Sequence, residues 1–553
     1  MKKPSVALAA LLALSLACAL TPPAAPRPTP NTPTAAPPAT SAPGTTGPAT
    51  AAPVTLLPNT AVPVATATAL AAVVPAAATL PPVQGDAPST KVATFYYPWY
   101  GNPPMDGQWI HWDQNGHQPP QDLGSDYYPA LGAYSSKDSA VVAQHMAWLR
   151  QAGIGVIISS WWGPHSREDQ AVPLLLKMAG QYGIQVTLHI EPYDGRTAAT
   201  LVSDVQYILQ HYGSDPAFFR STAASRYSPG SQPKPMLFVW AVETSNSHSA
   251  PVAASYWLPA LDAIHALPGG ALLIGNTLRA DWIDGAHLDG LYNYITLRLD
   301  QGGFIWARSL PPDALYVPSV IPGNSAQRVG YPPDTLVPRR DGATYNDQWT
   351  AALSTGVQPA LVTITSFNEW HEGSFIEPPA LGVNDGHGHP YADFGALPPQ
   401  GYLDLTRQWV GRFLATTWPA TYRARISVHT TSDWTTLNVA SGGAWLRPVR
   451  VSASAEAVHA DMEAGDRFLL MQPLASAQAG RAAEMIWDVL LSGLDPAGNL
   501  ALQIDRGSIG ATTVTVSNYI GATPVLVKTF QWSGVTTGRN SHVVNVPAAA
   551  LMH

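Results

Sequence analysis

Short apolar runs recur along the chain between residues 92 and 367. Eight such runs lie at 92–97, 155–162, 184–193, 235–242, 271–278, 290–295, 314–320 and 360–367. Most are continuously apolar rather than alternating, which is typical of parallel strands that are covered on both faces. Helical patterns separate several of them, at 136–153, 167–183, 197–213 and 401–417. This repeated strand–helix alternation predicts a (β/α)8 barrel, the TIM-barrel fold, over residues 89–420.

The pattern changes after about residue 420. The runs at 425–430, 512–520, 524–532 and 541–547 are short and β-branched, and Gly, Ser, Asn and Asp separate them. Such runs predict a compact all-β, sandwich-like domain over residues 421–553. This domain is expected either to bind carbohydrate, with Trp434, Trp445 or Trp532 as a platform, or to serve as a structural sandwich.

The first 18 residues are typical of a targeting segment. Two lysines precede an apolar run at 6–17 that is too short to span a bilayer, and the run ends at Cys18, the only cysteine. The letters "LSLAC" resemble a bacterial lipobox, with Ser15 where Leu is commoner. Residues 1–18 are therefore predicted to be a lipoprotein signal peptide that ends at a lipidated Cys18, the alternative being an ordinary secretory signal.

Residues 19–88 consist almost entirely of Pro, Ala, Thr, Val and Leu. A segment of this composition cannot bury enough surface to fold, so we expect a disordered tether. A lipid anchor followed by a long tether predicts a protein on the surface of a bacterium, outside the cytoplasmic membrane. It would contact that membrane only through the lipid.

Charge and composition narrow the expected partners. The formal charge of −8 is modest for 553 residues and there is no basic patch, so nucleic acid is not an expected partner. A single cysteine predicts a mature protein without an internal disulfide. The 18 Trp and 21 Tyr outnumber the 11 Phe, and such amphipathic aromatics often line binding clefts.

In a TIM barrel the active site lies at the carboxyl ends of the strands. Five of the predicted strands end in aromatic residues, at 96–102, 159–165, 189–196, 292–294 and 366–378, and the segments 189–196 and 366–378 also carry acids. Sugars are bound by such sets, because their C–H faces stack on Trp and Tyr and their hydroxyls pair with carboxylates. The predicted partner is therefore an oligosaccharide or polysaccharide.

The last of these segments, "SFNEWHEGSFIEP", carries two glutamates three residues apart, Glu369 and Glu372. Hydrolysis of a glycosidic bond needs a protonated carboxyl for the leaving oxygen and a carboxylate at the anomeric side. Two close carboxylates repel, which helps to keep one of them protonated near neutral pH. The alternative is a solvated acidic loop, but these acids follow a buried strand and stand beside Asn368, Trp370 and His371.

"SFNEWHEG" followed by "IEP" resembles the motif of glycoside hydrolase family 99, the endo-α-1,2-mannosidases. The segments at 95–103, 155–163, 189–196, 316–323 and 402–410 are similar to their family counterparts, so the resemblance covers about residues 90–418. Family members often have Thr-Gln after the motif glycine, where this chain has Ser374 and Phe375, a change that bears on the substrate. The WbsX-like proteins of polysaccharide biosynthesis have a similar Asn-Glu-Trp segment.

The resemblance implies a retaining endo-hydrolase of α-mannosidic linkages. In such an enzyme the sugar's own 2-hydroxyl attacks C1 and forms a 1,2-anhydro sugar. By resemblance, Glu369 is the base for that hydroxyl, and Glu372 is the general acid that later activates water. Two alternatives stay open: a polysaccharide-biosynthesis or export barrel without hydrolysis, and a non-catalytic carbohydrate-binding surface lipoprotein.

The resemblance also implies substrate-binding residues. Glu191 is expected to bond substrate hydroxyls, the alternative being a salt bridge to Arg196, which is itself a candidate contact. One of Trp161 and Trp162 is expected to form a stacking wall and the other to lie in the core. The remaining candidate contacts are Tyr96, Tyr97, Tyr294, Asn368 and His371.

No cofactor or metal is expected. His387 and His389, in the segment 384–390, raise the question of a metal site. Two histidines without further ligands at a suitable spacing are weak support for one, and the chemistry implied by the resemblance needs no ion.

Overall fold

The structure, a computed structural model, describes residues 86–296, 299, 303–311, 313–332 and 336–418 and, with several short gaps, residues 421–551. The predicted signal peptide with Cys18, and the predicted tether apart from residues 86–88, lie outside the described residues. Within the described part of the chain, no helix is long and apolar enough to cross a membrane.

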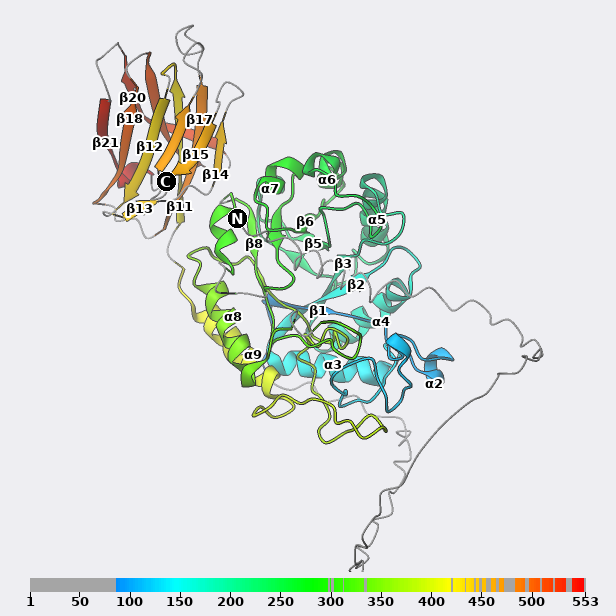
Figure 1. Cartoon of the computed structure of the whole chain (residues 1–553). Coiled ribbons are helices and arrows are strands. Elements are labelled where there is room, and N and C mark those ends of the chain that lie inside the picture. The colour runs from blue at the N-terminus through cyan, green and yellow to red at the C-terminus, as the bar shows by residue number, and fades with distance from the viewer. Residues whose placement is uncertain are drawn as a thin grey trace, which may run out of the picture. The chain divides into compact units, whose positions relative to one another are not determined.

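One parallel sheet forms the centre of the first part of the chain (Figure 1). Its strands are β1 (Ser89–Tyr96), β2 (Ile154–Trp161), β3 (Gln185–Ile190), β5 (Lys234–Val239), β6 (Leu272–Asn276), β7 (Gly290–Tyr292), β8 (Leu315–Val317), β9 (Ser319–Val320) and β10 (Val362–Ile364). The order is β8-β7-β6-β5-β3-β2-β1-β10-β9. The eight strands predicted from the sequence are confirmed; a short β4 (Arg220–Ser221), antiparallel to β5, was not predicted.

The ring is closed by one predicted strand that is divided in two. β8 pairs with β7 and β9 pairs with β10, and only Pro318 separates β8 from β9. A proline has no N–H to donate to a sheet, so the ladder is interrupted there. The Pro318 carbonyl still accepts from the N–H of Thr363 at 2.8 Å. The ends of the sheet are therefore joined, which confirms the (β/α)8 barrel.

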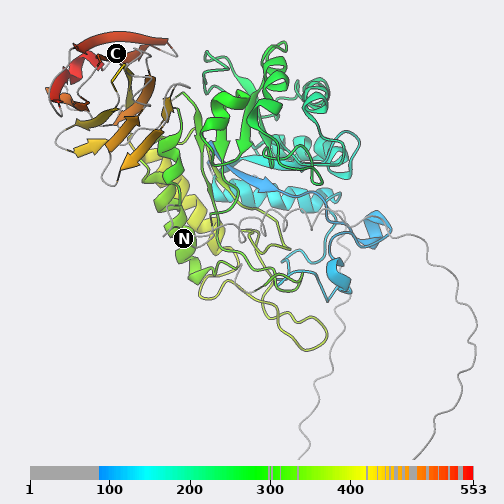
Figure 2. The ribbon, with the colours of Figure 1, turned by 45° about the horizontal axis from the view of Figure 1, so that its top comes forward.

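Helices lie around the outside of this sheet, with α8 beside α9 (Figures 1 and 2). The α-helices are α2 (Pro103–Asp106), α3 (Ser139–Ala152), α4 (Arg167–Gln181), α5 (Ala198–His211), α6 (Leu258–His265), α7 (Asp281–Ala286), α8 (Ala343–Leu353) and α9 (Gly401–Ala415). Short 3-10 helices are η1 (Gln114–Gly116), η2 (Ala254–Tyr256), η4 (Ile305–Ser309), η6 (Arg340–Gly342) and η7 (Ala548–Leu551). The four predicted helices correspond to α3, α4, α5 and α9, while α6 and α7 are too short to leave a clear periodicity.

Local sequence explains where the predicted helices begin and end. The side chains of Asp138 and Ser166 accept hydrogen bonds from the first turns of α3 and α4, and so cap two N–H groups that have no partner within the helix. Gly153 ends α3 in a left-handed conformation with φ of 79°, which glycine adopts without a steric penalty. β2 follows at once, and all its residues are buried, which explains its apolar run up to Ile158.

The second part of the chain is all-β, in two antiparallel sheets. Its strands are β11 (Thr421–Thr430), β12 (Trp434–Ser441), β13 (Ala444–Leu446), β14 (Arg450–Ala453), β15 (His459–Glu463), β16 (Arg467–Met471), β17 (Ala483–Ser492), β18 (Asn499–Arg506), β19 (Thr512–Ile520), β20 (Thr523–Trp532) and β21 (Asn540–Pro547). One sheet has the order β14-β17-β11-β19-β20, and the other has β15-β16-β12-β18-β21 with β13 beside β12.

These two sheets share a core of their own. Ile426 and Val514 from one sheet belong to the same buried cluster as Leu437 and Leu502 from the other. The sheets therefore pack face to face, which confirms the predicted sandwich. Trp532 is half-buried and stacks on His542 at 4.6 Å between ring centroids. The role of this sandwich in sugar binding stays a prediction.

Candidate active site

A pocket opens where the barrel strands end. It is lined by Tyr97, Trp99, Trp162, His189, Glu191, Trp240, Tyr294, Glu369 and Glu372, and it holds about 320 Å³ of space including its open mouth. These residues lie at or just after the ends of β1, β2, β3, β5, β7 and β10. Six of the residues predicted from the sequence meet here, namely Glu369, Glu372, Glu191, Trp162, Tyr97 and Tyr294.

The turn that carries the two glutamates is tied to the end of β1. The side-chain oxygen of Asn368 accepts from the Tyr97 N–H at 2.8 Å, and its amide nitrogen donates to the Tyr97 carbonyl at 3.0 Å. The Tyr100 hydroxyl accepts from the Trp370 N–H at 3.0 Å and donates to the Asn368 carbonyl at 3.1 Å. The buried Asn368 side chain therefore ties the turn to Tyr97, and the Tyr100 hydroxyl holds the backbone on either side of Glu369.

The third glutamate of the segment, Glu377, bonds inside the protein and does not line the pocket. Glu377 is fully buried, and its Oε2 accepts from the Trp370 Nε1–H at 2.8 Å and from the Tyr134 hydroxyl at 2.9 Å. Its Oε1 lies 3.1 Å from Nε2 of His145, whose Nδ1 lies 2.9 Å from the Tyr96 hydroxyl. Tyr96, a predicted substrate contact, thus faces this buried network and is not among the residues that line the pocket.

Burial affects the ionisation of Glu369 and Glu372. Glu369 is 2% exposed and Glu372 is 5% exposed. Burial raises the pKa of Glu369 well above its usual value, and the nearby charge of Glu372 raises it further. Burial, followed by the charge of Glu191, raises the pKa of Glu372 to about 7. Within the described residues Glu372 Oε2 is buried without a hydrogen-bond partner, so nothing on that side stabilises its ionised form.

Glu191 has the opposite environment. Its Oε1 accepts from the Ser160 hydroxyl at 2.8 Å and lies 3.0 Å from Nδ1 of His189. In contrast to Oε2 of Glu372, the Glu191 carboxylate is thus held by a hydrogen-bond donor.

Arg196 does not line the pocket, in contrast to the expectation. Its guanidinium is completely buried, and Nε, Nη1 and Nη2 all donate to backbone carbonyl oxygens, including those of Ile190 and Trp240. Burial lowers its pKa to about 10. Arg196 thus joins the segments that follow β3 and β5, and the expected alternative of a salt bridge to Glu191 is replaced by these backbone bonds.

The two adjacent tryptophans at the end of β2 point to opposite sides. Trp162 lines the pocket, and its Nε1–H donates to the Ser160 hydroxyl at 3.1 Å. Trp161 is buried, and its Nε1–H donates to Asp169 of α4 at 2.8 Å. Successive side chains alternate between the two faces of a strand, so only one of the pair can face the barrel interior. Trp162 is therefore the candidate for the stacking wall.

The pocket has further aromatic walls. The hydroxyls of Tyr97 and Tyr294 are in contact, and burial raises the pKa of both well above the usual range, so both stay neutral. Trp99, His189 and Trp240 also line the pocket, although sequence reasoning did not single them out. Each of the three lies in an apolar run or in a segment that resembles the family. Their position near a strand end was therefore the signal by which the sequence could have identified them.

His371, an expected substrate contact, is not among the residues that line the pocket. It is completely buried, its Nδ1 lies 2.5 Å from the carbonyl oxygen of Gly124, and burial lowers its pKa to about 4. His371 is therefore neutral at neutral pH. As a donor to Gly124, it attaches the glutamate turn to the loop that follows β1.

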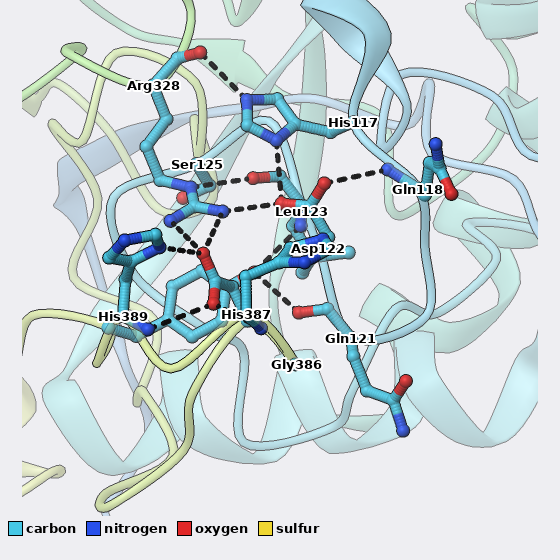
Figure 3. A network of polar contacts seen from close by, with 12 residues as sticks. His117, Gln118, Gln121, Asp122, Leu123, Ser125, Arg328, Gly386, His387 and His389 are labelled. Carbon is cyan, nitrogen blue, oxygen red and sulfur yellow. Dashed lines mark hydrogen bonds and ion pairs between the residues drawn. The ribbon is translucent and has the colours of Figure 1, made fainter.

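Three loops support this turn from outside. The Arg328 guanidinium donates to Asp122 at 2.5 Å and to Asp385 at 3.3 Å, and it joins the loops after β1, β9 and β10 (Figure 3). From the same loops, the Ser325 N–H donates to the Glu372 carbonyl at 2.8 Å. The loop network therefore holds the backbone of Glu372 without entering the pocket.

The two histidines of the segment 384–390 belong to this network. Nδ1 of His389 lies 3.0 Å from Asp385, and the His387 N–H donates to the same carboxylate at 2.9 Å (Figure 3). Because Arg328 also binds Asp385, a cationic side chain already occupies this position. The described residues contain no group of three or more His, Cys, Asp or Glu side chains that could hold a metal ion.

Comparisons with known proteins agree with this geometry. The family model described as "Glycosyl hydrolase family 99" matches residues 89–415. The glycoprotein endo-alpha-1,2-mannosidase of Mus musculus is 34% identical over 366 residues, which cover 58% of this chain and 74% of the relative. The glycoprotein endo-alpha-1,2-mannosidase-like protein of Homo sapiens is 33% identical, covering 60% of this chain and 78% of the relative.

A solved structure gives the same result. The GH99 endo-alpha-mannosidase from Bacteroides thetaiotaomicron is similar with a TM-score of 0.51 and 30% identity, over 59% of this chain and 98% of that chain. The matched residues 89–415 contain every barrel strand and every residue that lines the pocket. Because this match covers more than half of the chain, the protein belongs to glycosyl hydrolase family 99.

Proposed function

We propose that this glycoside hydrolase is a retaining endo-enzyme that cleaves α-mannosidic linkages in mannan or glycan chains through a 1,2-anhydro sugar. Family membership supports hydrolysis, and the names of the relatives support an α-mannosidic substrate. The observation that carries the proposal is the pair Glu369 and Glu372. Both glutamates line one pocket, and both have a raised pKa there.

The proposed first step moves two protons. In an α-mannoside the bond from C1 to the leaving oxygen and the bond from C2 to its hydroxyl are both axial and point in opposite directions. Glu369 takes the proton of the 2-hydroxyl while O2 attacks C1 from behind. The glycosidic bond breaks, and its oxygen leaves with the proton of Glu372. A pKa of about 7 for Glu372 suits a general acid at neutral pH.

The proposed second step reverses the two proton transfers of the first. Water attacks C1 of the anhydro sugar, Glu372 takes the proton of that water, and O2 regains its proton from Glu369. The two inversions at C1 give net retention. Neither carboxylate forms a bond to carbon, in contrast to the usual retaining scheme. The scheme therefore needs Glu369 ionised while Glu372 holds the proton, and burial makes the ionised Glu369 a stronger base.

The rest of the pocket suits a sugar. Trp162, Trp99 and Trp240 offer faces for the C–H surfaces of the rings, and Glu191 offers a carboxylate for their hydroxyls. Tyr97 and Tyr294 stay neutral beside the two catalytic glutamates and can donate hydrogen bonds to them or to the substrate. We therefore assign substrate binding to these side chains.

An α-mannosyl fluoride tests the two roles. Glu369→Gln and Glu372→Gln should each lower the rate on a natural glycoside by at least ~10²-fold, the usual size of general acid–base effects. Fluoride leaves with little protonation, so Glu372→Gln should recover much of its first-turnover rate on the fluoride, whereas Glu369→Gln should stay impaired. Rescue of Glu369→Gln instead would reverse the roles, and full activity of both variants on the glycoside would place the site elsewhere.

Product analysis tests the reaction itself. Digestion of α-mannan oligosaccharides, followed by mass spectrometry, should give internal cleavage products. Binding without cleavage would instead favour a non-hydrolytic role in polysaccharide synthesis or carbohydrate binding. We also propose, from the sequence of the first 88 residues, that the enzyme acts at the surface of a bacterium on a lipid anchor at Cys18.

A further inference from the structure

Ser160 is a buried polar residue of β2 that touches two side chains of the pocket. Its Oγ accepts from the Nε1–H of Trp162 at 3.1 Å and donates to Oε1 of Glu191 at 2.8 Å. The direction of both bonds follows from chemistry, because an indole N–H can only donate and an ionised carboxylate can only accept. One hydroxyl therefore serves the aromatic wall and the carboxylate of the pocket together.

Strand register places these groups side by side. β2 and β3 are parallel, and Ser160 is directly paired with His189. Because side chains alternate along a strand, Trp162 shares a face with Ser160, and Glu191 shares a face with His189. Trp161 lies on the other face, where it bonds Asp169 of α4.

His189, on the neighbouring strand, lies close to the same carboxylate oxygen. Its Nδ1 lies 3.0 Å from Oε1 of Glu191, and its Nε2 lies 2.5 Å from the hydroxyl of Tyr292 on β7. Within the described residues, the hydrogen bond from Ser160 and the close approach of His189 are thus both at Oε1 of Glu191. Oε2 is left to accept a hydrogen bond from a ligand in the pocket.

We propose that Ser160 is a positioning residue for sugar binding, which fixes the indole of Trp162 and the carboxylate of Glu191 as one unit. This proposal rests on the proposed function in one respect, namely that the ligand of the pocket is a sugar. A pyranose stacked on Trp162 then presents its hydroxyls at a set distance from Glu191. Without the Ser160 hydroxyl, the indole N–H and the carboxylate each lose a partner, and the two groups can move independently.

The indole N–H of Trp162 reports this coupling without any need for activity. The full chain, labelled with ¹⁵N in its tryptophan indoles, gives one N–H signal per tryptophan, and Trp162→Phe identifies the relevant signal by its loss. Glu191→Gln should shift the Trp162 signal in the protein that retains Ser160. The same change should leave that signal in place when Ser160→Ala is also present, because the bridging hydroxyl is gone.

Kinetics test the consequence for binding. Ser160→Ala should lower kcat/KM on an α-mannan oligosaccharide by about 10-fold, as expected for a lost hydrogen bond to a charged group. Most of this loss should lie in KM, because Trp162 and Glu191 hold the sugar in the ground state as well as in the transition state. Ser159→Ala is the matched control, since Ser159 is a buried serine on the opposite face of the same strand. It should stay close to the wild-type value.

Each outcome supports or overturns the proposal. An equal shift of the Trp162 signal in both backgrounds, or no shift in either, would show that Ser160 does not couple the two groups. A loss in Ser159→Ala equal to that in Ser160→Ala would indicate a general packing effect. If the wild type hydrolyses no α-mannoside but the coupling is seen, the proposed function fails while the role of Ser160 stands.

Discussion

Replacing Glu372 with glutamine should make the protein more stable above neutral pH, even though it removes the proposed general acid. Glu372 is 5% exposed, and burial, followed by the charge of Glu191, raises its pKa from the usual 4.5 to about 7. Its ionised form is therefore unfavourable in the folded protein, whereas the unfolded chain hydrates it fully. Glutamine has nearly the same shape and never ionises, so the variant avoids this unfavourable charge.

The size of the effect follows from the pKa. Each pKa unit corresponds to 1.36 kcal/mol, so a rise from 4.5 to about 7 corresponds to ~3 kcal/mol. Because the pKa of Glu372 is higher in the folded protein than in the unfolded chain, its protonated form contributes this free energy to the stability of the wild type. The contribution is fully present below about pH 4.5 and is lost as the pH rises through 7. The variant should match the wild type near pH 4.5 and exceed it by ~3 kcal/mol at pH 8. For a barrel of this size the gain corresponds to roughly 4 °C in Tm.

Thermal melts of the full chain at pH 4.5, 6 and 8, followed by circular dichroism, measure this difference. Glu377→Gln is the matched control, because Glu377 is equally buried but accepts hydrogen bonds from Trp370 and Tyr134. It should lower Tm at all three pH values. The reasoning is refuted if Glu372→Gln lowers Tm at pH 8, or if it raises Tm by the same amount at pH 4.5.

Three further expectations concern pH dependence, domain structure and location. Above about pH 7, kcat/KM should fall as Glu372 loses its proton. Glu191→Gln should move this fall to lower pH, because it removes a charge that raises the pKa of Glu372. If the fall stays at the same pH, another group causes it. A truncated protein of residues 89–420 should still hydrolyse short soluble substrates. If it is insoluble or inactive, the sandwich supports the barrel structurally. If only the hydrolysis of polymers is lost, the sandwich has a role in substrate binding. Cys18→Ala should abolish lipid labelling and membrane retention in cell fractionation, and unchanged labelling and fractionation would contradict the lipoprotein prediction.

The eight barrel strands were predictable because each leaves a local signal. Helices cover the outer face of a parallel barrel sheet and packed side chains fill the interior, so a strand such as β2 is buried at every position and mostly apolar. The position of the active site was also predictable, since strand ends in this fold converge on one rim. The family-like motif then identified Glu369 and Glu372. The short helices α6 and α7 gave too few residues for a periodic pattern.

Which neighbour of a pair faces the pocket was decided only by the tertiary structure. The sequence offered Trp161 with Trp162 and Tyr96 with Tyr97, and in each pair the second residue lines the pocket while the first bonds inside the protein. Alternation along a strand guarantees that the two point apart. The side that faces the pocket depends on how the strand is oriented within the closed ring.

The partners of the buried polar groups also depend on contacts between distant segments. Glu377 stands five residues after Glu372, yet it bonds Tyr134 and lies beside His145, from the loop after β1 and from α3. Arg196 follows Glu191 closely but donates to the backbone after β5. A buried charged side chain is unfavourable unless neighbouring groups pair with it or form hydrogen bonds to it. Its role as catalyst or as structural support is therefore set by the packing of the whole barrel, which local sequence does not record.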